Sequence, residues 1–340
     1  MPGCTRWPRT ANVSDFSVVI PTYRRPDRLR SCLEGFSRLN YPRHRFEIIV
    51  VDDGSPERPE GIISRWRDQL DVKLVCQANA GPAAARNHGA QHARYTRLAF
   101  IDDDCVPRPD WLESLRTVFD AAPDHLIGGH TINALLQNPF SSASQGLVEY
   151  LCGYFDGRQG RTRLFTSNNM AVRADHFHAA GGFDTRFPRA AGEDREFCDR
   201  WIAQGRGTTV ARGAIVMRAH SLTLQTFWQQ HLEYGRGAAS FRHVRAARRG
   251  ETVRVKPISF YAGLLKFPFN GGVTLNAVRM ATLFILAQLA NGIGFLSSWH
   301  DGLENAEARI GRSRLDTPPP VRRPDHVEKL PMMRDRNTGG

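Results

Sequence analysis

The sequence predicts an α/β protein built on a mostly parallel central sheet flanked by helices. Four short, apolar and largely β-branched segments occur within the first hundred residues, and the segments between them have helical periodicity. Strands that alternate with helices in this way form parallel sheets with right-handed crossovers. The second and fourth apolar segments end in aspartates. Because open sheets of this class bind ligands beyond the carboxyl ends of their strands, these aspartates indicate a functional site.

The first half of the chain supplies the alternating elements. The expected strands are 16–20, 46–51, 72–75 and 98–101. The expected helices are 26–39, 62–70 and 79–94. In the first helix Leu29, Leu33 and Phe36 follow the spacing of one helical face. We expect Asn79 to cap the third helix, with Pro82 in its first turn.

The second half is less regular and predicts a helical C-terminal extension. Helices are expected over 109–121, 145–155, 192–204 and 223–247, and strands over 126–136, 164–173 and 208–217. The residues after about 311 are rich in proline and charge, which predicts disorder. The expected organisation is a flexible N-terminus (1–14), an α/β domain (15–222), a basic and apolar helical region (223–310) and a disordered tail (311–340).

Composition limits the classes of partner. The 340 residues include 46 Lys plus Arg and 34 Asp plus Glu, for a formal net charge of +12, which favours phosphates or acidic lipid headgroups. No helix-turn-helix or zinc-finger spacing occurs, so we expect no nucleic-acid partner. The six cysteines form no CxxC pair, which fits a reducing compartment. No apolar leader precedes residue 15, and we expect a cytoplasmic protein.

Residues 274–296 are the longest apolar segment, and three interpretations of it stay open. The segment is long enough to span a bilayer. Arg279, Gln288 and two asparagines interrupt it, which is also typical of an interfacial helix beside basic residues. The third possibility is a buried helix of a soluble fold.

The apolar segment 98–101 ends in Asp102, Asp103 and Asp104. In an extended chain, alternate side chains share a face, so we expect Asp102 and Asp104 to point the same way. Two such carboxylates repel each other unless a cation lies between them, and Mg²⁺-like ions prefer oxygen ligands. A metal site is therefore predicted; a solvated acidic turn is the alternative.

Other candidates lie beyond the second strand and on the third helix. Asp52 and Asp53 are placed to accept hydrogen bonds from a base or ribose, or else to shape a turn before Gly54. Arg86 lies near a helix N-terminus, where a guanidinium group binds phosphate well; a surface arginine is the alternative. The glycine-rich dinucleotide and P-loop motifs are absent from the sequence.

Later in the chain Gly192 precedes Glu193 and Asp194 at the start of an expected helix. Acidic residues there often only complement the helix dipole. A centre that holds a leaving phosphate also needs a base for the incoming hydroxyl, and a carboxylate can serve. Asp194 is the first choice and Glu193 the second. His220 follows the last expected strand, where it would complete a metal shell, contact phosphate or be purely structural.

Six motifs occur in order between residues 16 and 220. They are Ser-Val-Val-Ile-Pro-Thr-Tyr (17–23), Ile-Ile-Val-Val-Asp-Asp-Gly-Ser (48–55), Asn-x-Gly (79–81) with Ala-Arg-Asn-x-Gly (85–89), Phe-Ile-Asp-Asp-Asp (100–104), Gly-Gly-Phe-Asp (181–184) and Gly-Glu-Asp (192–194). As an ordered set they resemble the family 2 glycosyltransferases of GT-A fold. The resemblance implies a UDP-, GDP- or dTDP-linked sugar donor, a Mg²⁺ or Mn²⁺ ion and a glycan or lipid-linked acceptor.

The resemblance also assigns roles to residues. It carries the D-x-D motif onto Asp102 and Asp104 and the catalytic base onto Asp194; the residues themselves suggest His220 as a further metal ligand and Glu193 as the second candidate base. The donor contacts that it implies are Pro21, Thr22, Tyr23, Asp52, Asp53, Asn79, Arg86, Asp102, Asp103, Asn168 and Asn169. An inverting, single-displacement reaction at the inner face of the cell membrane is the expected activity, with peripheral membrane contact.

Two departures from the family pattern limit the expectation. Cys105 occupies a position where many members have an acidic residue, so no ligand role is expected there. The Q-x-x-R-W motif of processive synthases is missing, which favours addition of a single sugar. Two rival hypotheses remain. Residues 100–106 also fit the nucleophile motif of haloacid dehalogenase-like phosphatases, with Asp102 as nucleophile, and a catalytically inactive nucleotide-sugar-binding protein is the other.

Overall fold

The computed structural model describes residues 15–156, 164–187, 191–250 and 256–315. Residues up to Trp299 form one compact unit, and His300–Gly340 form a second one. The expected flexible N-terminus lies outside the described residues. Of the expected disordered tail, residues 311–315 are helical and the remainder also lies outside them.

Among the described residues the sheet has eight strands in the order β3-β2-β1-β4-β7-β6-β8-β5. Its parallel half contains β1 (Phe16–Thr22), β2 (Phe46–Asp52), β3 (Val72–Cys76) and β4 (Arg97–Ile101). The other half contains β5 (Cys105–Pro107), β6 (Leu126–Asn133), β7 (Asn169–Arg173) and β8 (Thr208–Arg218). There β7 runs antiparallel to β4 and β6, whereas β6 and β8 are parallel. The predicted mostly parallel sheet is confirmed.

The helices flank this sheet or extend beyond it. They are α1 (Pro26–Ser37), α2 (Glu60–Ile63), α3 (Pro82–Gln91), α4 (Trp111–Ala121), α5 (Pro139–Asp156), α6 (Ala174–Ala179), α7 (Glu193–Ala203), α8 (Leu224–Arg249), α9 (Ile258–Lys266) and α10 (Leu275–Leu315). Three short 3₁₀ turns lie at Arg43–Arg45, Ser64–Trp66 and Phe267–Phe269.

Two apolar clusters cover the two faces of the parallel half. Alternate residues of β1 divide between them: Val18 and Ile20 face one cluster, whereas Val19 faces the other. The first cluster includes side chains of α1 and α4, and the second includes those of α3, α6 and α7. Since both faces are covered, these strands are apolar at nearly every position, which is why they are recognisable in the sequence.

Several local predictions were wrong. The helix expected over 62–70 is a short α2 followed by a 3₁₀ turn. Asn79 does not cap α3: the cap is Gly81, at φ +88°, a conformation that favours glycine. Pro82 does lie in the first turn. The strand expected over 164–173 begins only at Asn169, and the short β5 and α6 were not predicted.

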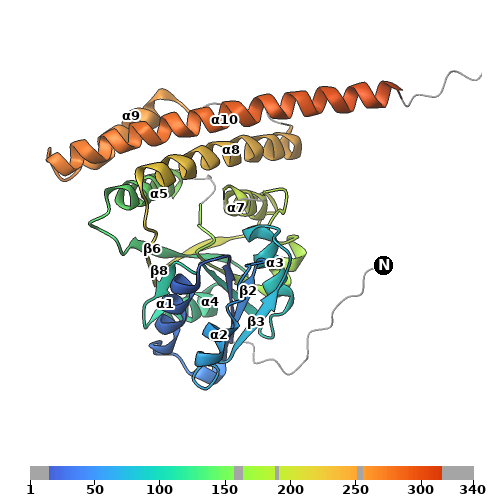
Figure 1. Cartoon of the computed structure of the whole chain (residues 1–340), viewed down its shortest axis with the longest axis vertical. Coiled ribbons are helices and arrows are strands. Elements are labelled where there is room, and N and C mark those ends of the chain that lie inside the picture. The colour runs from blue at the N-terminus through green and yellow to red at the C-terminus, as the bar shows by residue number, and fades with distance from the viewer. Residues whose placement is uncertain (1–14, 157–163, 188–190, 251–255, 316–340) are drawn as a thin grey trace, which may run out of the picture. The chain divides into compact units, whose positions relative to one another are not determined.

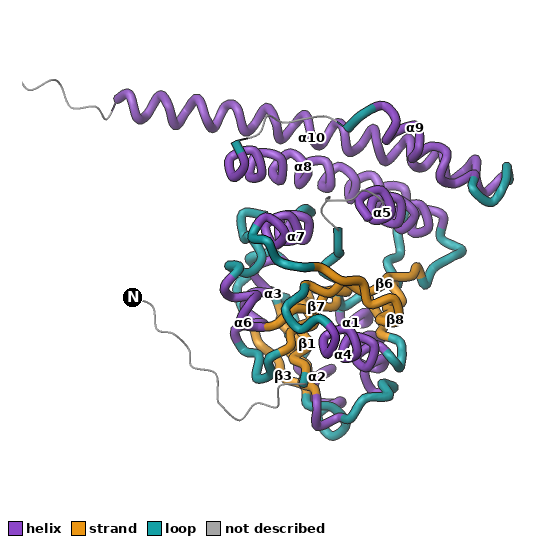
Figure 2. The backbone as a smooth tube through the Cα atoms, turned by 180° about the vertical axis from the view of Figure 1, so that it is seen from behind, coloured by secondary structure: helices purple, strands orange, loops and turns teal. Residues whose placement is uncertain are grey.

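The C-terminal helices have an apolar core of their own. Ala143 and Leu147 of α5 pack with Phe227 of α8, Leu264 of α9 and Phe284 of α10. Helices α8 and α10 lie side by side (Figures 1 and 2), and their backbones come into close contact at glycines. An added Cβ at Gly235 would overlap the carbonyl oxygen of Asn291, and one at Gly294 would overlap that of Leu232.

Candidate functional site

The three consecutive aspartates lie in a turn beyond β4. The strand stops at Ile101, and the Cys105 N–H donates to the Asp102 carbonyl at 3.1 Å. The premise of an extended chain, with Asp102 and Asp104 on one face, was therefore wrong. Because the chain turns here, each carboxylate meets a different set of partners.

Asp104 is held by Arg218 of β8, by His220 shortly after that strand and by Arg28 of α1. The β5–β8 pairing places Cys105 opposite Arg218, whose Nε lies 3.4 Å from Asp104 Oδ1. Nδ1 of His220 lies 2.9 Å from Oδ2, and Arg28 approaches to 3.7 Å. Burial alone would raise the pKa of Asp104, but Arg218 and His220 outweigh it and hold that pKa well below its usual value.

Asp103 is buried against the end of β1. The Thr22 hydroxyl donates to its Oδ2 at 2.7 Å, and Arg25 Nη1 lies 3.3 Å from Oδ1. Burial raises the pKa of Asp103 to about 6, against the opposing effect of Arg25. This carboxylate thus fixes the β4 turn against the end of β1.

Arg86 connects the β4 turn to the start of α7. Its Nη2 donates to Oδ1 of Asp102 at 2.6 Å, and its Nη1 donates to Oε1 of Glu193 at 3.1 Å. The arginine side chain is 2% exposed and lies against the ring of Phe183, 5.7 Å from its centroid. Two acidic motifs far apart in sequence are thereby brought to one place by a single guanidinium group.

Glu193 and Asp194, at the start of α7, differ in how exposed their carboxylates are. Gly192, at φ +99°, turns the chain into the helix. Glu193 is 3% exposed, and burial together with Asp194 raises its pKa to about 7. Asp194 is only half-buried; its Oδ1 accepts from the Arg195 N–H at 2.7 Å, and desolvation raises its pKa. Asp194 is thus the more accessible of the two carboxylates.

The aspartates after β2 also differ. Asp53 accepts hydrogen bonds from the Gln77 side chain at 2.7 Å and from the N–H groups of Ala80 and Gly81 at 2.9 Å each. Asn79 donates to the Asp53 carbonyl at 2.9 Å. Asp53 and Asn79 therefore shape the loop into α3. The Asp52 carboxylate accepts only from the Ser55 N–H, at 3.2 Å, among the described residues, and Asp52 is 1% exposed.

The remaining candidates lie at the end of β1 and the start of β7. The Tyr23 side chain is 40% exposed and Pro21 is partly exposed. Oδ1 of Asn168 accepts from the hydroxyls of Thr131 and Thr166. Asn169 accepts from Trp111 Nε1 at 2.9 Å and donates to two backbone carbonyls, so its amide joins the strands of the sheet.

Helix α8 closes the site, a feature that the sequence did not reveal. Oε1 of Gln230 lies 2.7 Å from His220 Nε2, and Arg248 Nη1 donates to Glu196 of α7 at 2.7 Å. Between these contacts an added Cβ at Gly237 would overlap the carbonyl oxygen of Ala191. The helix therefore rests directly on the residues that begin α7.

We expect Gly237→Ala to lower the melting temperature and to reduce turnover, because a methyl group at this contact displaces the start of α7. The expected loss of stability is about 1–3 kcal/mol. Thermal unfolding of the variant measures it. Gly153→Ala in α5 is the matched control, because no atom lies within 4 Å of its added Cβ. Equal melting temperatures for Gly237→Ala and the wild type would contradict the expectation.

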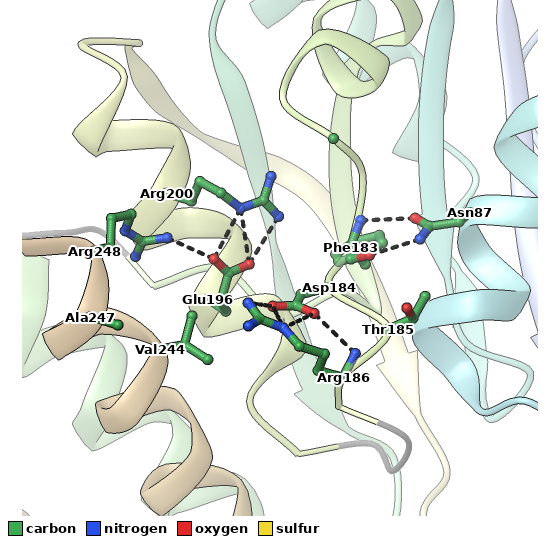
Figure 3. Close-up of a pocket in the computed structure, with 11 residues that line it drawn as sticks. Asn87, Phe183, Asp184, Thr185, Arg186, Glu196, Arg200, Val244, Ala247 and Arg248 are labelled. Atoms are coloured by element: carbon green, nitrogen blue, oxygen red, sulfur yellow. Dashed lines mark hydrogen bonds and ion pairs between the residues drawn. The ribbon is translucent and has the colours of Figure 1, made fainter. Parts of the chain in front are cut away.

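A cavity of about 510 Å³ lies beside this site, between the loop that precedes α7 and helix α8 (Figure 3). Its charged groups are paired with one another: Glu196 with Arg200 and Arg248, and Asp184 with Arg186. None of Asp102, Asp104, Glu193 and Asp194 lines it. This cavity is therefore distinct from the group of acidic residues.

The part of the chain that contains these residues is similar to known proteins. Residues 17–180 match the model of glycosyl transferase family 2. The matched region holds every candidate donor residue and Asp104, whereas Glu193, Asp194 and His220 follow it in the sequence.

Two curated relatives illustrate the similarity. The glycosyltransferase AglE of Haloferax volcanii is 27% identical over 214 residues, which cover 61% of this chain and 67% of that protein. The validoxylamine A glucosyltransferase of Streptomyces hygroscopicus subsp. jinggangensis is 30% identical over 240 residues, covering 62% of this chain and 56% of that protein. The chain thus spans between about half and two thirds of the length of these relatives.

A solved structure shares the fold. The mannosyltransferase PcManGT from Pyrobaculum calidifontis, in complex with GDP-Man and Mn²⁺, aligns with a TM-score of 0.53 at 17% sequence identity. The alignment covers 88% of this chain and 82% of that one. The predicted GT-A fold is confirmed, with C-terminal helices added to it.

Proposed function

We propose that this protein is an inverting glycosyltransferase that moves a sugar from a nucleotide-diphosphate donor to a hydroxyl of a glycan or lipid-linked acceptor. The observation that carries the proposal is the Arg86 bridge, which joins Asp102 at the end of β4 to Glu193 at the start of α7. This bridge brings a residue proposed to bind the donor close to the residues proposed to act as the base, which supports the proposal. The homology to family 2 enzymes supports the same activity.

The donor binds along the carboxyl ends of β1, β2 and β4 in this proposal. Asp52 accepts a hydrogen bond from the base or ribose, and Tyr23 lies at the exposed rim. Arg86 faces the diphosphate, where its positive charge favours the anion. The solved structure of PcManGT holds GDP-Man, which supports a nucleotide-sugar donor here.

In this proposal Asp104 and His220 would hold a divalent cation, which would take the place of the Arg28 guanidinium that lies 3.4 Å from His220 Nδ1. Oδ2 of Asp104 and Nδ1 of His220 are 2.9 Å apart, and carboxylate oxygen with imidazole nitrogen is a donor set that Mn²⁺ accepts. Among the described residues no three such side chains converge, so substrate phosphates would complete the shell. Asp102, the other carboxylate of the D-x-D motif, is paired with Arg86. A bound ion would offset the charge that develops on the leaving diphosphate.

The chemical step uses Asp194 as general base. The acceptor oxygen attacks the anomeric carbon and forms the new C–O bond, while Asp194 takes the hydroxyl proton. The bond from the anomeric carbon to the diphosphate oxygen breaks, and the diphosphate leaves with the electron pair. One displacement from the opposite side inverts the configuration. The raised pKa of Asp194, caused by desolvation, makes it a stronger base than a solvated aspartate.

Titration calorimetry with a panel of UDP-, GDP- and dTDP-sugars, each with and without Mn²⁺, tests this function. We expect one nucleotide class to bind at micromolar to millimolar Kd, and Mn²⁺ to tighten it. A product assay with the same donor then tests transfer. Failure of every donor to bind, with or without metal, would contradict the proposal.

We further propose that the protein contacts the inner face of the membrane through α9 and α10. Leu275–Ser298 is long and apolar enough to cross a bilayer, but 28% of its apolar window is buried. One side of α10 packs against α8, which carries many arginines, so lipid cannot surround the helix. Its other side exposes apolar residues: Val278, Ile285, Leu289, Ile293 and Leu296. This pattern favours an in-plane, interfacial helix over a spanning one.

The charge around α9 and α10 supports an anionic lipid surface as the partner. Residues 256–298 contain no Asp or Glu, whereas Lys266 and Arg279 are exposed beside the apolar stripe. Ten of the thirteen exposed large hydrophobic side chains among the described residues lie between Ile258 and Leu296. Basic residues next to an apolar face attract acidic headgroups.

We expect the full chain to sediment with vesicles that contain phosphatidylglycerol, and less with neutral vesicles. The double change Ile285→Glu and Leu289→Glu should weaken binding roughly tenfold or more, because two apolar contacts are lost. Leu136→Glu is the matched control, since Leu136 is 75% exposed on a loop away from α10. Equal binding by the double variant and the wild type would contradict the membrane contact.

A further inference from the structure

One face of α8 lines the candidate site from end to end. Gln230, Tyr234, Gly237 and Phe241 follow the i, i+4, i+7, i+11 spacing of a single helical face. Gln230 contacts His220, and Gly237 lies against Ala191. The guanidinium carbon of Arg195 lies 4.4 Å from the ring centroid of Phe241. Tyr234 therefore lies between the Asp104–His220 pair and the start of α7.

The surroundings of the phenol agree with this position. Its ring lies 5.4 Å from that of His231, centroid to centroid. Burial raises the pKa of the Tyr234 hydroxyl, and four groups also act on it: Arg218 lowers that pKa, whereas Asp194, Glu193 and Asp104 raise it. Tyr234 is thus near both groups of carboxylates. No described residue forms a hydrogen bond with its hydroxyl, and that oxygen is not among the fully buried ones.

We infer that Tyr234 binds the transferred sugar. This inference rests on the proposed function, in which the diphosphate lies near Asp104 and the attacking hydroxyl near Asp194. In a single displacement the sugar must lie between these two, which is where the α8 face places Tyr234. A neutral hydroxyl both donates and accepts, which suits sugar hydroxyls. The neighbouring carboxylates disfavour an anionic ligand at this point.

The experiment is titration calorimetry of Tyr234→Phe with two ligands in the presence of Mn²⁺: the preferred nucleotide sugar and its nucleoside diphosphate. The phenylalanine ring keeps the packing against His231 and removes only the hydroxyl. We expect affinity for the nucleotide sugar to fall about fivefold, the effect of one hydrogen bond. Affinity for the nucleoside diphosphate should stay within twofold of the wild-type value.

Tyr95→Phe is the control, because Tyr95 lies before β4 at the other end of that strand, and both of its affinities should match the wild type. A Tyr234→Phe variant that binds the nucleotide sugar as the wild type does would overturn the inference, and so would an equal loss for both ligands. Melting temperatures check that the fold is kept. If the wild-type protein binds no nucleotide sugar at all, the proposed function itself fails.

Discussion

Asp194→Asn is expected to lower turnover about a thousandfold while leaving the Kd of the nucleotide sugar within about threefold. A general base contributes roughly 10²–10⁴ to the rate, and an amide cannot take the acceptor proton. Asparagine keeps the size of the side chain and still accepts the Arg195 N–H hydrogen bond that Asp194 accepts now. This variant should therefore bind the nucleotide sugar normally but transfer it very slowly.

A transfer assay and calorimetry on the same preparation measure the two effects. Asp175→Asn is a suitable control, because Asp175 lies at the start of α6 and pairs with Arg173 rather than with the site. Retention of more than a tenth of wild-type turnover by Asp194→Asn would reject Asp194 as the base. Glu193→Gln would then be the next variant to assay, since Glu193 is the neighbouring carboxylate.

Arg86→Met is expected to destabilise the fold by about 3 kcal/mol and to abolish donor binding. Removal of one partner of a buried ion pair leaves an uncompensated charge, which costs roughly 3–5 kcal/mol. Glu193 is almost fully buried, and its Oε2 has no hydrogen-bond partner among the described residues. Without Arg86 its remaining oxygen would also be unpaired. Urea unfolding measures the loss.

A double-mutant cycle separates the contribution of the ion pair to the free energy of unfolding from that of side-chain packing. Adding Glu193→Gln to Arg86→Met removes the unpaired charge, so we expect more than about 1 kcal/mol of the stability to return. Arg94→Met is the control, because Arg94 pairs with Asp71 at the surface and such pairs contribute roughly 0–1 kcal/mol. A loss below about 1 kcal/mol for Arg86→Met would show that the bridge is not a structural link.

The parallel half of the sheet was predictable because its strands are covered on both faces. Such strands are continuous apolar runs, and the aspartates that follow β2 and β4 mark their ends without any tertiary information. The wrong prediction concerned the backbone conformation directly after β4. Asp102 and Asp104 were treated as part of an extended strand, whereas the chain turns after Ile101. A turn was the alternative for that segment, but its geometry could not be predicted, because it is held by Thr22 and Arg25, which are distant in sequence.

Contacts between distant segments could not be predicted from sequence patterns. Arg86 and Glu193 are 107 residues apart, and only the fold brings them together. Helix α8 was expected, but its packing on Ala191 depends on Gly237, and a glycine within a helical pattern has no single meaning. For residues 274–296 the sequence left three possibilities open. The structure shows one buried side and one exposed side of α10, which its apolar composition could not reveal.

Proton NMR of the transfer product tests the central claim most directly, namely that Asp194 faces a donor held at the β4 turn and acts in a single displacement. The coupling constant of the new anomeric proton, compared with that of the donor, reports whether the configuration has changed. We expect an inverted linkage from the earliest time points. A retained configuration would require two displacements or a front-side attack, and would contradict the assignment of Asp194 as base.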